Sequence, residues 1–435
     1  MDALYRVVNH ENVSAKARES ADVIPVNAKG DSIVRMKYDI IIVGGGLAGL
    51  YCAHRLTQTD NTCKILIFER NKTVGGRIDT VHGIEAGAGR FNNKHHRLLR
   101  LIDELGLTET IVPISNFEYF MENGEKHNWN KIYGLINKID RFSPNPPNNL
   151  TFLKYANTIP GVSTSIDLLT KFYGYSSELT DMNARDAMAL MKRHFNKSIK
   201  YYTMKGGLSQ ITRELVKRLQ ATGQVQILTH RRVTNIHENG DFEISCDGFS
   251  RNYVASKCIC AVTKDTLLTI PIFRPIYPML QMIKTLPLCR IYAKGVYDIV
   301  GDDKVTINNN LRIIIPIDRK TDMTMISYTD NKYAIFWRDL LDTKGMDAVN
   351  REHQRLLRET FKHDDIPLPR KTQVFYWEHG VAYFGPGFDS KTMPHQIMQP
   401  FKNIPLFVCG ENYSEKNNQW MEGALDTSDY ILERI

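Results

Sequence analysis

The sequence predicts an α/β fold in which a dinucleotide-binding domain is interrupted by a second domain of mixed sheet and helix. Residues 39–50 read Asp-Ile-Ile-Ile-Val-Gly-Gly-Gly-Leu-Ala-Gly-Leu, an apolar strand that leads into a glycine turn and a helix. A second apolar strand, residues 65–68, ends at Glu69. A third, residues 404–408, lies near the C-terminus and is followed by Gly410. Similar strands at both ends of the chain indicate one discontinuous Rossmann-like domain with a second domain inserted into it.

The first glycine turn fits the pattern G-x-G-x-x-G. Gly44 permits the tight turn, Gly46 lets the backbone approach a pyrophosphate, and Gly49 lets the helix pack closely on the strand. The first N–H groups of the helix, at the positive end of its dipole, then face the phosphates. Taken alone, the motif also fits a glycine-rich turn that binds nothing.

Glu69 and the segment after it extend this motif. Glu69 lies 20 residues after Gly49, where a carboxylate accepts both hydroxyls of an adenosine ribose and disfavours the 2′-phosphate of NADP. Residues 74–77, Val-Gly-Gly-Arg, add a second glycine pair and a cation. An NAD site has no need of this further clamp, whereas a longer dinucleotide does, so the sequence favours FAD.

Length and charge limit the class of protein. The chain has 435 residues, more than one ordinary core accommodates, so two domains are expected. The net charge of +8 is dispersed in short pairs such as Lys192-Arg193 and Arg231-Arg232. Such a distribution is typical of a solvated surface, and it argues against a nucleic-acid partner.

The seven cysteines and the apolar runs bear on location. The cysteines are odd in number, form no C-x-x-C and lie partly in apolar runs such as residues 255–262. We interpret them as reduced core residues, with no disulfide and no metal site. No run reaches about 18 apolar residues, and a signal peptide is not evident. The sequence predicts a soluble cytoplasmic or otherwise intracellular protein, or a virion protein if the gene is viral.

The remaining elements follow in chain order. Residues 1–36 are polar and are interpreted as an N-terminal extension. Apolar residues recur at helical spacing over residues 95–107, where Gly106 ends the helix. We further expect a loop at 143–149, a helix ending at 219, strands at 225–228, 232–236, 242–245, 253–262, 291–297, 311–317, 323–328 and 333–337, and helices at 347–361 and 421–435.

These elements divide the chain. Residues 37–110, 200–270 and 402–435 are assigned to the FAD-binding domain, and residues 111–199 and 271–401 to the substrate domain. The last strand and helix should return to the first glycine turn, since ligands of such sheets lie beyond the carboxyl ends of the strands.

Seven short motifs, in this order, resemble the flavin-dependent amine oxidases, a superfamily that includes monoamine, polyamine and L-amino-acid oxidases. They are Val-Gly-Gly-Gly-Leu-Ala-Gly-Leu at 43–50, Phe-Glu-Arg at 68–70, Gly-Gly-Arg at 75–77, Glu-Ala-Gly-Ala-Gly-Arg at 85–90, Lys-Gly-Gly at 205–207, Gly-Glu at 410–411 and Trp-Met-Glu-Gly-Ala at 420–424. The resemblance covers nearly the whole chain after residue 36. It implies bound FAD and oxidation of the carbon–nitrogen bond of an amine or amino acid, with oxygen as acceptor and peroxide as product.

The resemblance also implies the cofactor contacts, at Gly44, Gly46, Gly49, Glu69, Arg70, Gly76, Arg77, Gly89, Arg90, Val233, Gly410, Glu411 and Met421. Arg77 would lie by the pyrophosphate, and Val233 would pair with adenine through its backbone. Glu411 and Met421 would lie near the ribityl chain and the isoalloxazine.

Two departures from the family pattern are evident. Family members usually have an arginine two residues after the ribose acid, where this chain has Asn71 with Arg70 beside it. Ala382 stands where some monoamine oxidases carry the cysteine that links to flavin. FAD is therefore expected to be non-covalent.

Four residues are implied at the substrate. Arg90 stands where L-amino-acid oxidases bind the substrate carboxylate; pairing with an internal acid or a flavin oxygen is the alternative. Tyr383 and Trp420 resemble the aromatic pair that faces the flavin in monoamine oxidases, and core packing is the alternative. Lys294 is preferred over Arg290 as the strand residue that holds a water at flavin N5, although a strand lysine can also point to solvent.

The sequence thus predicts an FAD-dependent amine or amino-acid oxidase with a small-molecule substrate, assembled as a homodimer. The alternative is an FAD-binding scaffold or virion-type interaction protein with little activity. The net positive charge of the chain and its N-terminal extension favour this alternative. Demethylation of a basic peptide tail is a third possibility. It is disfavoured because the long helical insertion of such enzymes is missing.

Overall fold

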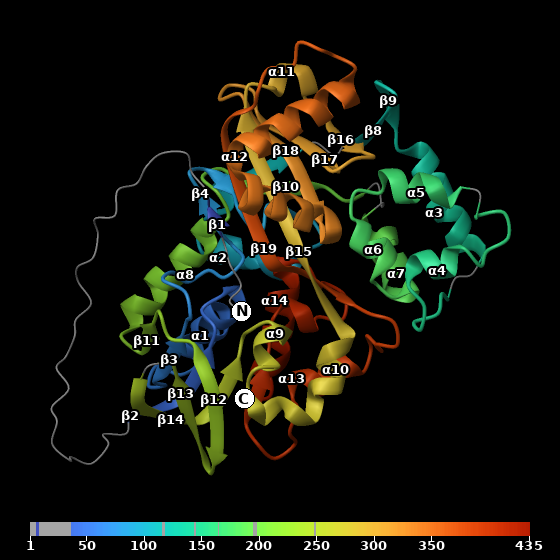
Figure 1. Ribbon diagram of the computed structural model, residues 1–435. Coiled ribbons are helices and arrows are strands. Elements are labelled where there is room, and N and C mark those ends of the chain that lie inside the picture. The colour runs from blue at the N-terminus through green and yellow to red at the C-terminus, as the bar shows by residue number, and fades with distance from the viewer. Residues whose placement is uncertain are drawn as a thin grey trace.

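The computed structural model describes residues 6–7, 36–114, 118–142, 145–163, 165–194, 198–247 and 249–435. Most of the predicted N-terminal extension, and residues 143–144 of the predicted loop, lie outside these ranges. The described chain forms a cofactor-type α/β region, a region built on a large second sheet, and a lobe of short helices beside that sheet (Figure 1).

The first region is a seven-stranded sheet flanked by helices. Its strands, in spatial order, are β11 (Val225–Leu228), β3 (Ile65–Phe68), β2 (Met36–Val43), β14 (Phe249–Cys260), β13 (Asp241–Cys246) and β12 (Val233–Asn239), with β20 (Leu406–Val408) paired to β14. In the parallel part, Val43 is in register with Phe68 and with Cys260, and Cys260 with Val408. The carboxyl ends of β2, β3, β14 and β20 therefore meet at one edge.

Helices hold this edge together. Helix α1 (Leu47–Thr59) follows β2, and α14 (Met421–Leu432) packs along it, with the Tyr51 hydroxyl donating to Asp429 at 2.7 Å. Helix α8 (Ser209–Thr222) also packs on α1, while α2 (His96–Glu104) packs on α14. As expected from the sequence, the C-terminal strand and helix return to the first glycine turn.

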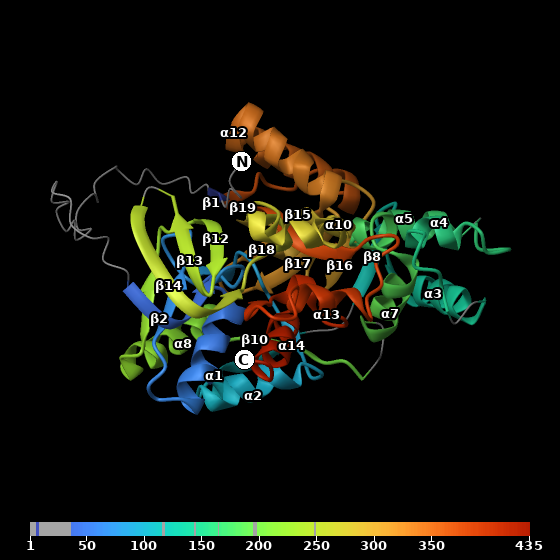
Figure 2. The ribbon, with the colours of Figure 1, turned by 90° about the horizontal axis from the view of Figure 1, so that it is seen from below.

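The second region is an eight-stranded sheet. Its strands, in spatial order, are β1 (Arg6–Val7), β19 (Arg370–Phe384), β15 (Ile283–Lys294), β18 (Met323–Asp330), β17 (Ile313–Asp318), β16 (Lys304–Ile307), β8 (Glu118–Glu122) and β9 (Glu125–Asn128). Helix α12 (Asn331–Phe361) covers one face, and its Trp337 is fully buried there (Figure 2). The large sheet separates α12 from the cavity described below.

A helical lobe and a small sheet complete the molecule. The lobe contains α3 (Asn130–Phe142), α4 (Phe152–Ala156), α5 (Ile166–Phe172), α6 (Ser176–Thr180) and α7 (Ala184–His194), gathered at one end of the molecule in Figure 2. The small sheet has the order β6 (Phe91–Asn92), β10 (Tyr201–Met204) and β7 (Ile111–Ile114). It lies between the cofactor region and the lobe, so the chain crosses repeatedly from one region to the other.

The structure confirms the predicted fold class, and one predicted strand is wrong. Residues 333–337 lie in the first turns of α12. Ala334 and Trp337 are both fully buried and three residues apart, which is helical spacing. Aromatic residues favour strands because β-propensity reflects packing on a half-buried surface, and at residues 333–337 a helix supplies that surface. The domain boundaries stay predictions.

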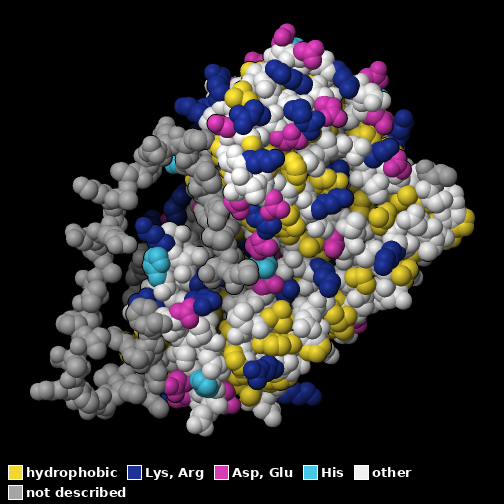
Figure 3. All heavy atoms as spheres, in the orientation of Figure 1, with side chains coloured by type: hydrophobic (Ala, Val, Ile, Leu, Met, Phe, Trp, Pro, Cys, Tyr) yellow, Lys and Arg dark blue, Asp and Glu magenta, His cyan; other side chains and the backbone are white. Residues whose placement is uncertain are grey.

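The surface mixes charges of both signs. On the face shown in Figure 3, lysine and arginine alternate with aspartate and glutamate, and apolar side chains lie between them. The seven cysteines are buried, and none forms a disulfide. Among the described residues, no helix combines the length and apolar character needed to cross a membrane.

Candidate active site

The glycine turn after β2 is built for close backbone approach. Gly44 has a φ of 108°, and a Cβ there would overlap the carbonyl oxygen of Ala261. A Cβ on Gly49 would overlap the carbonyl oxygen of Gly44, the strand–helix contact expected from the motif. Substitution at either position therefore displaces the turn itself.

The space above the turn remains open for a ligand. Gly75 N donates to Gly45 O at 2.8 Å, which lays the second glycine pair beside the first. A Cβ on Gly46 would meet only Gly76 Cα, at 3.9 Å. Helix α1 has no side-chain cap and no acidic residue in its first turn. Its first N–H groups thus suit a pyrophosphate.

Glu69 is fixed at the end of β3, and the segment of Val233 lies beside it. The buried carboxylate accepts Gly45 N at 2.9 Å and Asn71 N at 2.8 Å. A carboxylate has about four acceptor positions, so about two remain for ribose hydroxyls. Arg231 N donates to Glu69 O at 2.8 Å, which brings the start of β12, at Val233, next to the acid.

An ion pair joins the second glycine loop to the C-terminal segment. Arg77 Nη1 lies 2.6 Å from Glu411 Oε1 and 3.3 Å from the Gly380 carbonyl oxygen. Glu411 also accepts the backbone N–H of Gln419 and the side-chain amide of Asn412. Arg70, by contrast, is exposed. The pair ties together three segments that are distant in sequence.

Two side-chain amides just before α14 have hydrogen-bond donors without a partner among the described residues. Asn418 Nδ2 and Gln419 Nε2 are buried, and within the described residues neither has a hydrogen-bond partner. Gln419, Met421 and Gly89 all line one large cavity. Unsatisfied buried donors cost about 1–3 kcal/mol each. Together with the open glycine cradle, they fit a bound dinucleotide with a polar ring system, as FAD has.

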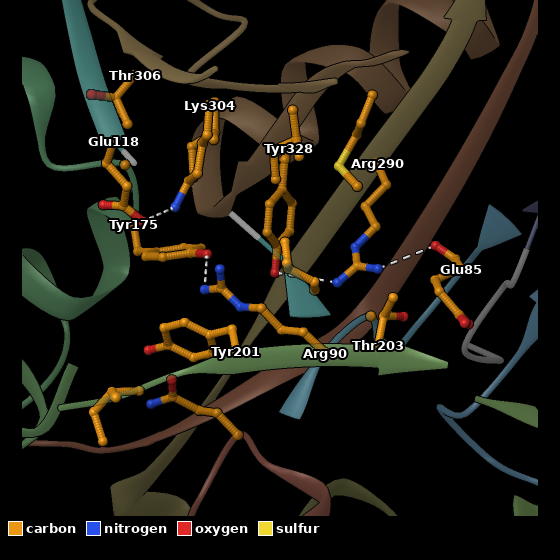
Figure 4. Close-up of a pocket in the computed structure, with 18 of the residues that line it drawn as sticks. Glu85, Arg90, Glu118, Tyr175, Tyr201, Thr203, Arg290, Lys304, Thr306 and Tyr328 are labelled. Carbon is orange, nitrogen blue, oxygen red and sulfur yellow. Dashed lines mark hydrogen bonds and ion pairs between the residues drawn. The ribbon is translucent and has the colours of Figure 1, made fainter. Parts of the chain in front are cut away.

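The cavity lies between the eight-stranded sheet, the small sheet, the helical lobe and residues 419–421, with a volume of about 1230 Å³ (Figure 4). Its walls carry many charged and aromatic side chains. These include Glu85, Arg90, Glu118, Tyr173, Tyr175, Glu178, Tyr201, Arg290, Tyr292, Lys304, Tyr328, Tyr383 and Trp420. Concave sites of this mixed character are typical of small-molecule binding.

Arg90 projects into the cavity from the loop before β6. Its Nη2 donates to the Tyr175 hydroxyl at 3.2 Å, and its guanidinium lies 4.7 Å from the centre of the Tyr201 ring and 5.9 Å from that of Trp420. Tyr201 stacks on Trp420 at 6.2 Å. Burial lowers the pKa of Arg90, but Tyr175, Tyr201 and Glu118 raise it by more, so the guanidinium stays charged.

Arg290 reaches the same cavity from β15. Its Nη1 donates to the Glu85 carbonyl oxygen at 3.1 Å, and its guanidinium lies 4.7 Å from the centre of the Tyr328 ring. Leu288 and Tyr292 line the cavity on either side of it, as strand alternation requires. Lys294, four residues on, is not among the lining residues and pairs in register with Arg370 and Met323.

The acidic side chains of the cavity differ in their interactions and in the shifts of their pKa values. Glu118 forms an ion pair with Lys304. Burial raises the pKa of Glu178 to about 8, although the Tyr173 hydroxyl that it accepts opposes the shift. Glu178 is therefore protonated at neutral pH. Burial also raises the pKa of Glu85, whose carboxylate accepts Leu208 N at 2.8 Å and Thr80 Oγ1 at 2.9 Å.

The implied substrate residues are partly brought together. Arg90 and Trp420 form one aromatic–cation cluster at the cavity wall. Tyr383 also lines the cavity, but it is buried in the apolar cluster of the helical lobe, near Tyr173 and Glu178. Gly380, three residues earlier on β19, is the one that contacts Arg77. The substrate roles of all four residues stay predictions.

Several cavity residues were missed by sequence reasoning. Tyr175, Glu178 and Tyr201 belong to none of the motifs recognised in the sequence. Lys304 and Tyr328 come from strands β16 and β18, where no motif marks them. A signal was present only at Arg290, a charged residue within the apolar run of β15.

Comparisons with known proteins agree with this architecture. Residues 42–105 match the family model described as "NAD(P)-binding Rossmann-like domain". The chain is 45% identical to "Uncharacterized protein R188" of Acanthamoeba polyphaga mimivirus, over 91% of this chain and 93% of that protein.

Shorter matches link the chain to flavin-containing amine oxidases. It is 33% identical to "Amine oxidase [flavin-containing] A" of Equus caballus and 30% identical to "Amine oxidase [flavin-containing] B" of Rattus norvegicus, but these alignments span only 14% and 22% of those proteins. The solved structure of putrescine oxidase bound to putrescine superposes with a TM-score of 0.69 at 15% identity, over 92% of this chain and 99% of that chain.

Proposed function

We propose that the chain binds FAD non-covalently and oxidises the carbon–nitrogen bond of a small amine or amino acid, because part of its sequence and its fold resemble those of flavin-containing amine oxidases. Oxygen would be the acceptor and peroxide the product. The observation that carries the proposal is the cavity of about 1230 Å³, which reaches the Gly89 and Met421 segments and has Arg90 and Trp420 in its wall.

The residues present suit the cofactor. The glycine cradle at Gly46 and the N-terminus of α1 would hold the pyrophosphate, Glu69 the adenosine ribose, and the open amides of Asn418 and Gln419 a polar ring system. FAD, when bound, supplies the hydride acceptor. Ala382 offers no sulfur for a covalent link, so acid or heat denaturation should release all of the flavin.

The protein side of the reaction is binding, orientation and exclusion of water. Arg90 would bind a substrate carboxylate, since two parallel hydrogen bonds from a guanidinium fix its orientation. Trp420 and Tyr201, stacked together under that guanidinium, would hold the substrate against the cofactor side of the cavity. The helical lobe and the large sheet form the other walls, which would limit the access of water to the substrate.

Arg90→Lys tests this arrangement. The variant keeps the positive charge but loses the planar guanidinium that forms two parallel hydrogen bonds. It should therefore raise KM for an amino acid about tenfold or more, while KM for a simple amine without a carboxylate should not change. Equal effects on both substrates would contradict the carboxylate role. Purified protein that carries no FAD would contradict the proposal as a whole.

An FAD-binding scaffold is the second candidate, and the viral source of the relative with 45% identity favours it. A scaffold has no need of an open, charged cavity. Protein that retains FAD but whose flavin resists reduction by every amine and amino acid would support the scaffold. The homodimer and the intracellular or virion location stay predictions.

A further inference from the structure

Two guanidinium groups face the same cavity from different elements. Figure 4 shows Arg90 beside Tyr175 and Tyr201, and Arg290 between Tyr328 and Glu85, and both arginines line the cavity. Within the described residues, neither arginine forms an ion pair with a carboxylate. Each is instead held by an aromatic face and a neutral oxygen.

Arg290 has an unused edge. It is only 7% exposed, and its Nε is buried without a hydrogen-bond partner in the part of the chain that the structure describes. Nη1 is occupied by the Glu85 carbonyl oxygen, while Nη2 has only a long contact of 3.5 Å to the Tyr328 hydroxyl. The edge formed by Nε and Nη2 therefore suits two oxygens of one anionic group.

The other charges of the cavity largely cancel. Lys304 pairs with Glu118, and Lys192 pairs with Asp140 at 3.0 Å. Burial lowers the pKa of Lys304, and Glu118 opposes that shift. These two pairs add no net charge.

What remains is one excess positive charge. Glu178 is neutral at pH 7, because its pKa is raised to about 8. Glu85 can offset one guanidinium, but its carboxylate is occupied by Leu208 and Thr80, and only its backbone oxygen meets Arg290. The guanidiniums of Arg90 and Arg290 carry two positive charges and Glu85 carries one negative charge, so the cavity has a net charge of +1. This charge repels a cationic amine that has no anionic group of its own.

We propose that the substrate carries two anionic groups besides its amine, and that Arg90 and Arg290 each bind one of them. The substrate class is then an amino dicarboxylate, whose charge of −1 with a protonated amine neutralises the cavity. This inference rests on the proposed oxidase function and narrows its substrate. A diamine such as the one bound in the related solved structure is excluded by the same charge count.

The experiment separates binding from oxidation. Holoprotein is titrated with glutarate and with its monoamide, neither of which has an amine to oxidise, and binding is followed through the flavin spectrum or by calorimetry. Glutarate should bind about 10- to 100-fold more tightly than the monoamide, the difference of one charged hydrogen-bonded pair. Equal affinities in the wild-type protein overturn the inference without any variant.

Variants assign the preference to Arg290. Arg290→Gln should remove the preference for glutarate, and Arg290→Lys should keep part of it because the charge remains. The matched control is Arg319→Gln, since Arg319 also lies over a tyrosine ring, that of Tyr297 at 5.7 Å, but its side chain is 64% exposed and is not among the residues that line the cavity. A preference that survives Arg290→Gln overturns the assignment.

Anaerobic flavin reduction by L-glutamate and L-glutamine completes the design. Faster reduction by the diacid, lost in Arg290→Gln, supports the inference. Reduction by neutral amines or diamines but not by diacids overturns it while the oxidase function stands. Arg290-dependent binding of glutarate, with no reduction by any amine, supports the diacid site and overturns the proposed oxidase function instead.

Discussion

Glu178 should make the protein less stable as the pH rises. It lies on α6 with only 2% of its surface exposed, and burial raises its pKa to about 8, against about 4.3 in an unfolded chain. Between these two values the folded protein binds one proton more than the unfolded protein. Stability is therefore fully present below about pH 4.3 and is lost as the pH rises through about 8, by about 1.4 kcal/mol per unit.

Glu178→Gln isolates this effect, because the amide resembles the protonated acid and does not titrate. From pH 6 to 8 the wild type should lose about 2 kcal/mol more than the variant. With about 2.1 cal/mol/K of unfolding entropy per residue, a chain of 435 residues loses about 2–3 °C in Tm for that energy. Thermal unfolding of both proteins across this range measures the difference.

The control is Glu125→Gln, which removes an exposed carboxyl whose side chain is 80% accessible. It should follow the wild type at every pH. If the Tm curves of the wild type and Glu178→Gln run parallel from pH 6 to 8, Glu178 is ionised in the folded protein. The charge count of the cavity would then be wrong by one.

Two further substitutions test the cofactor site. Gly49→Ala places a methyl group against the Gly44 carbonyl oxygen, so it should cost about 1–3 kcal/mol and lower the flavin content of the purified protein, measured from its visible absorbance. Gly134→Ala, in α3 with nothing within 4 Å, is the control and should be neutral or slightly stabilising; equal flavin content in both variants would contradict the packing role. Arg77→Gln leaves buried Glu411 without its ion pair and should weaken FAD binding about tenfold or more in a fluorescence titration. An unchanged affinity would show that the Arg77–Glu411 pair does not shape the cofactor site.

The cofactor region was predictable because its signals are local. The strand, the turn and the helix around Gly44 follow one another without a break from Met36 to Thr59, and Gly49 meets the carbonyl oxygen of Gly44 in the same turn. Glu69 comes directly after β3, which is the next strand after β2 in the sequence and is also its neighbour in the sheet. The return of the C-terminal helix followed from the same topological rule.

The cavity was not predictable in the same way. Its walls join the loop before β6, several helices of the lobe and most strands of the large sheet, so residues such as Tyr175, Arg290 and Lys304 meet only after folding. Lys294 and Arg290 share one side of an ideal strand, but β15 carries register shifts on both of its partners, and only Arg290 lines the cavity. The protonation of Glu178 depends on burial that no local pattern records.

The most direct test of the account is anaerobic reduction of the bound flavin. Holoprotein is mixed with one equivalent or more of each member of a panel of amines, diamines, neutral amino acids and acidic amino acids, and the visible flavin absorbance is followed. The account predicts full bleaching by at least one amino compound, fastest with an acidic amino acid, and recovery of the absorbance with peroxide release when oxygen is admitted. Flavin that stays oxidised with every compound would contradict an oxidase function for this cavity.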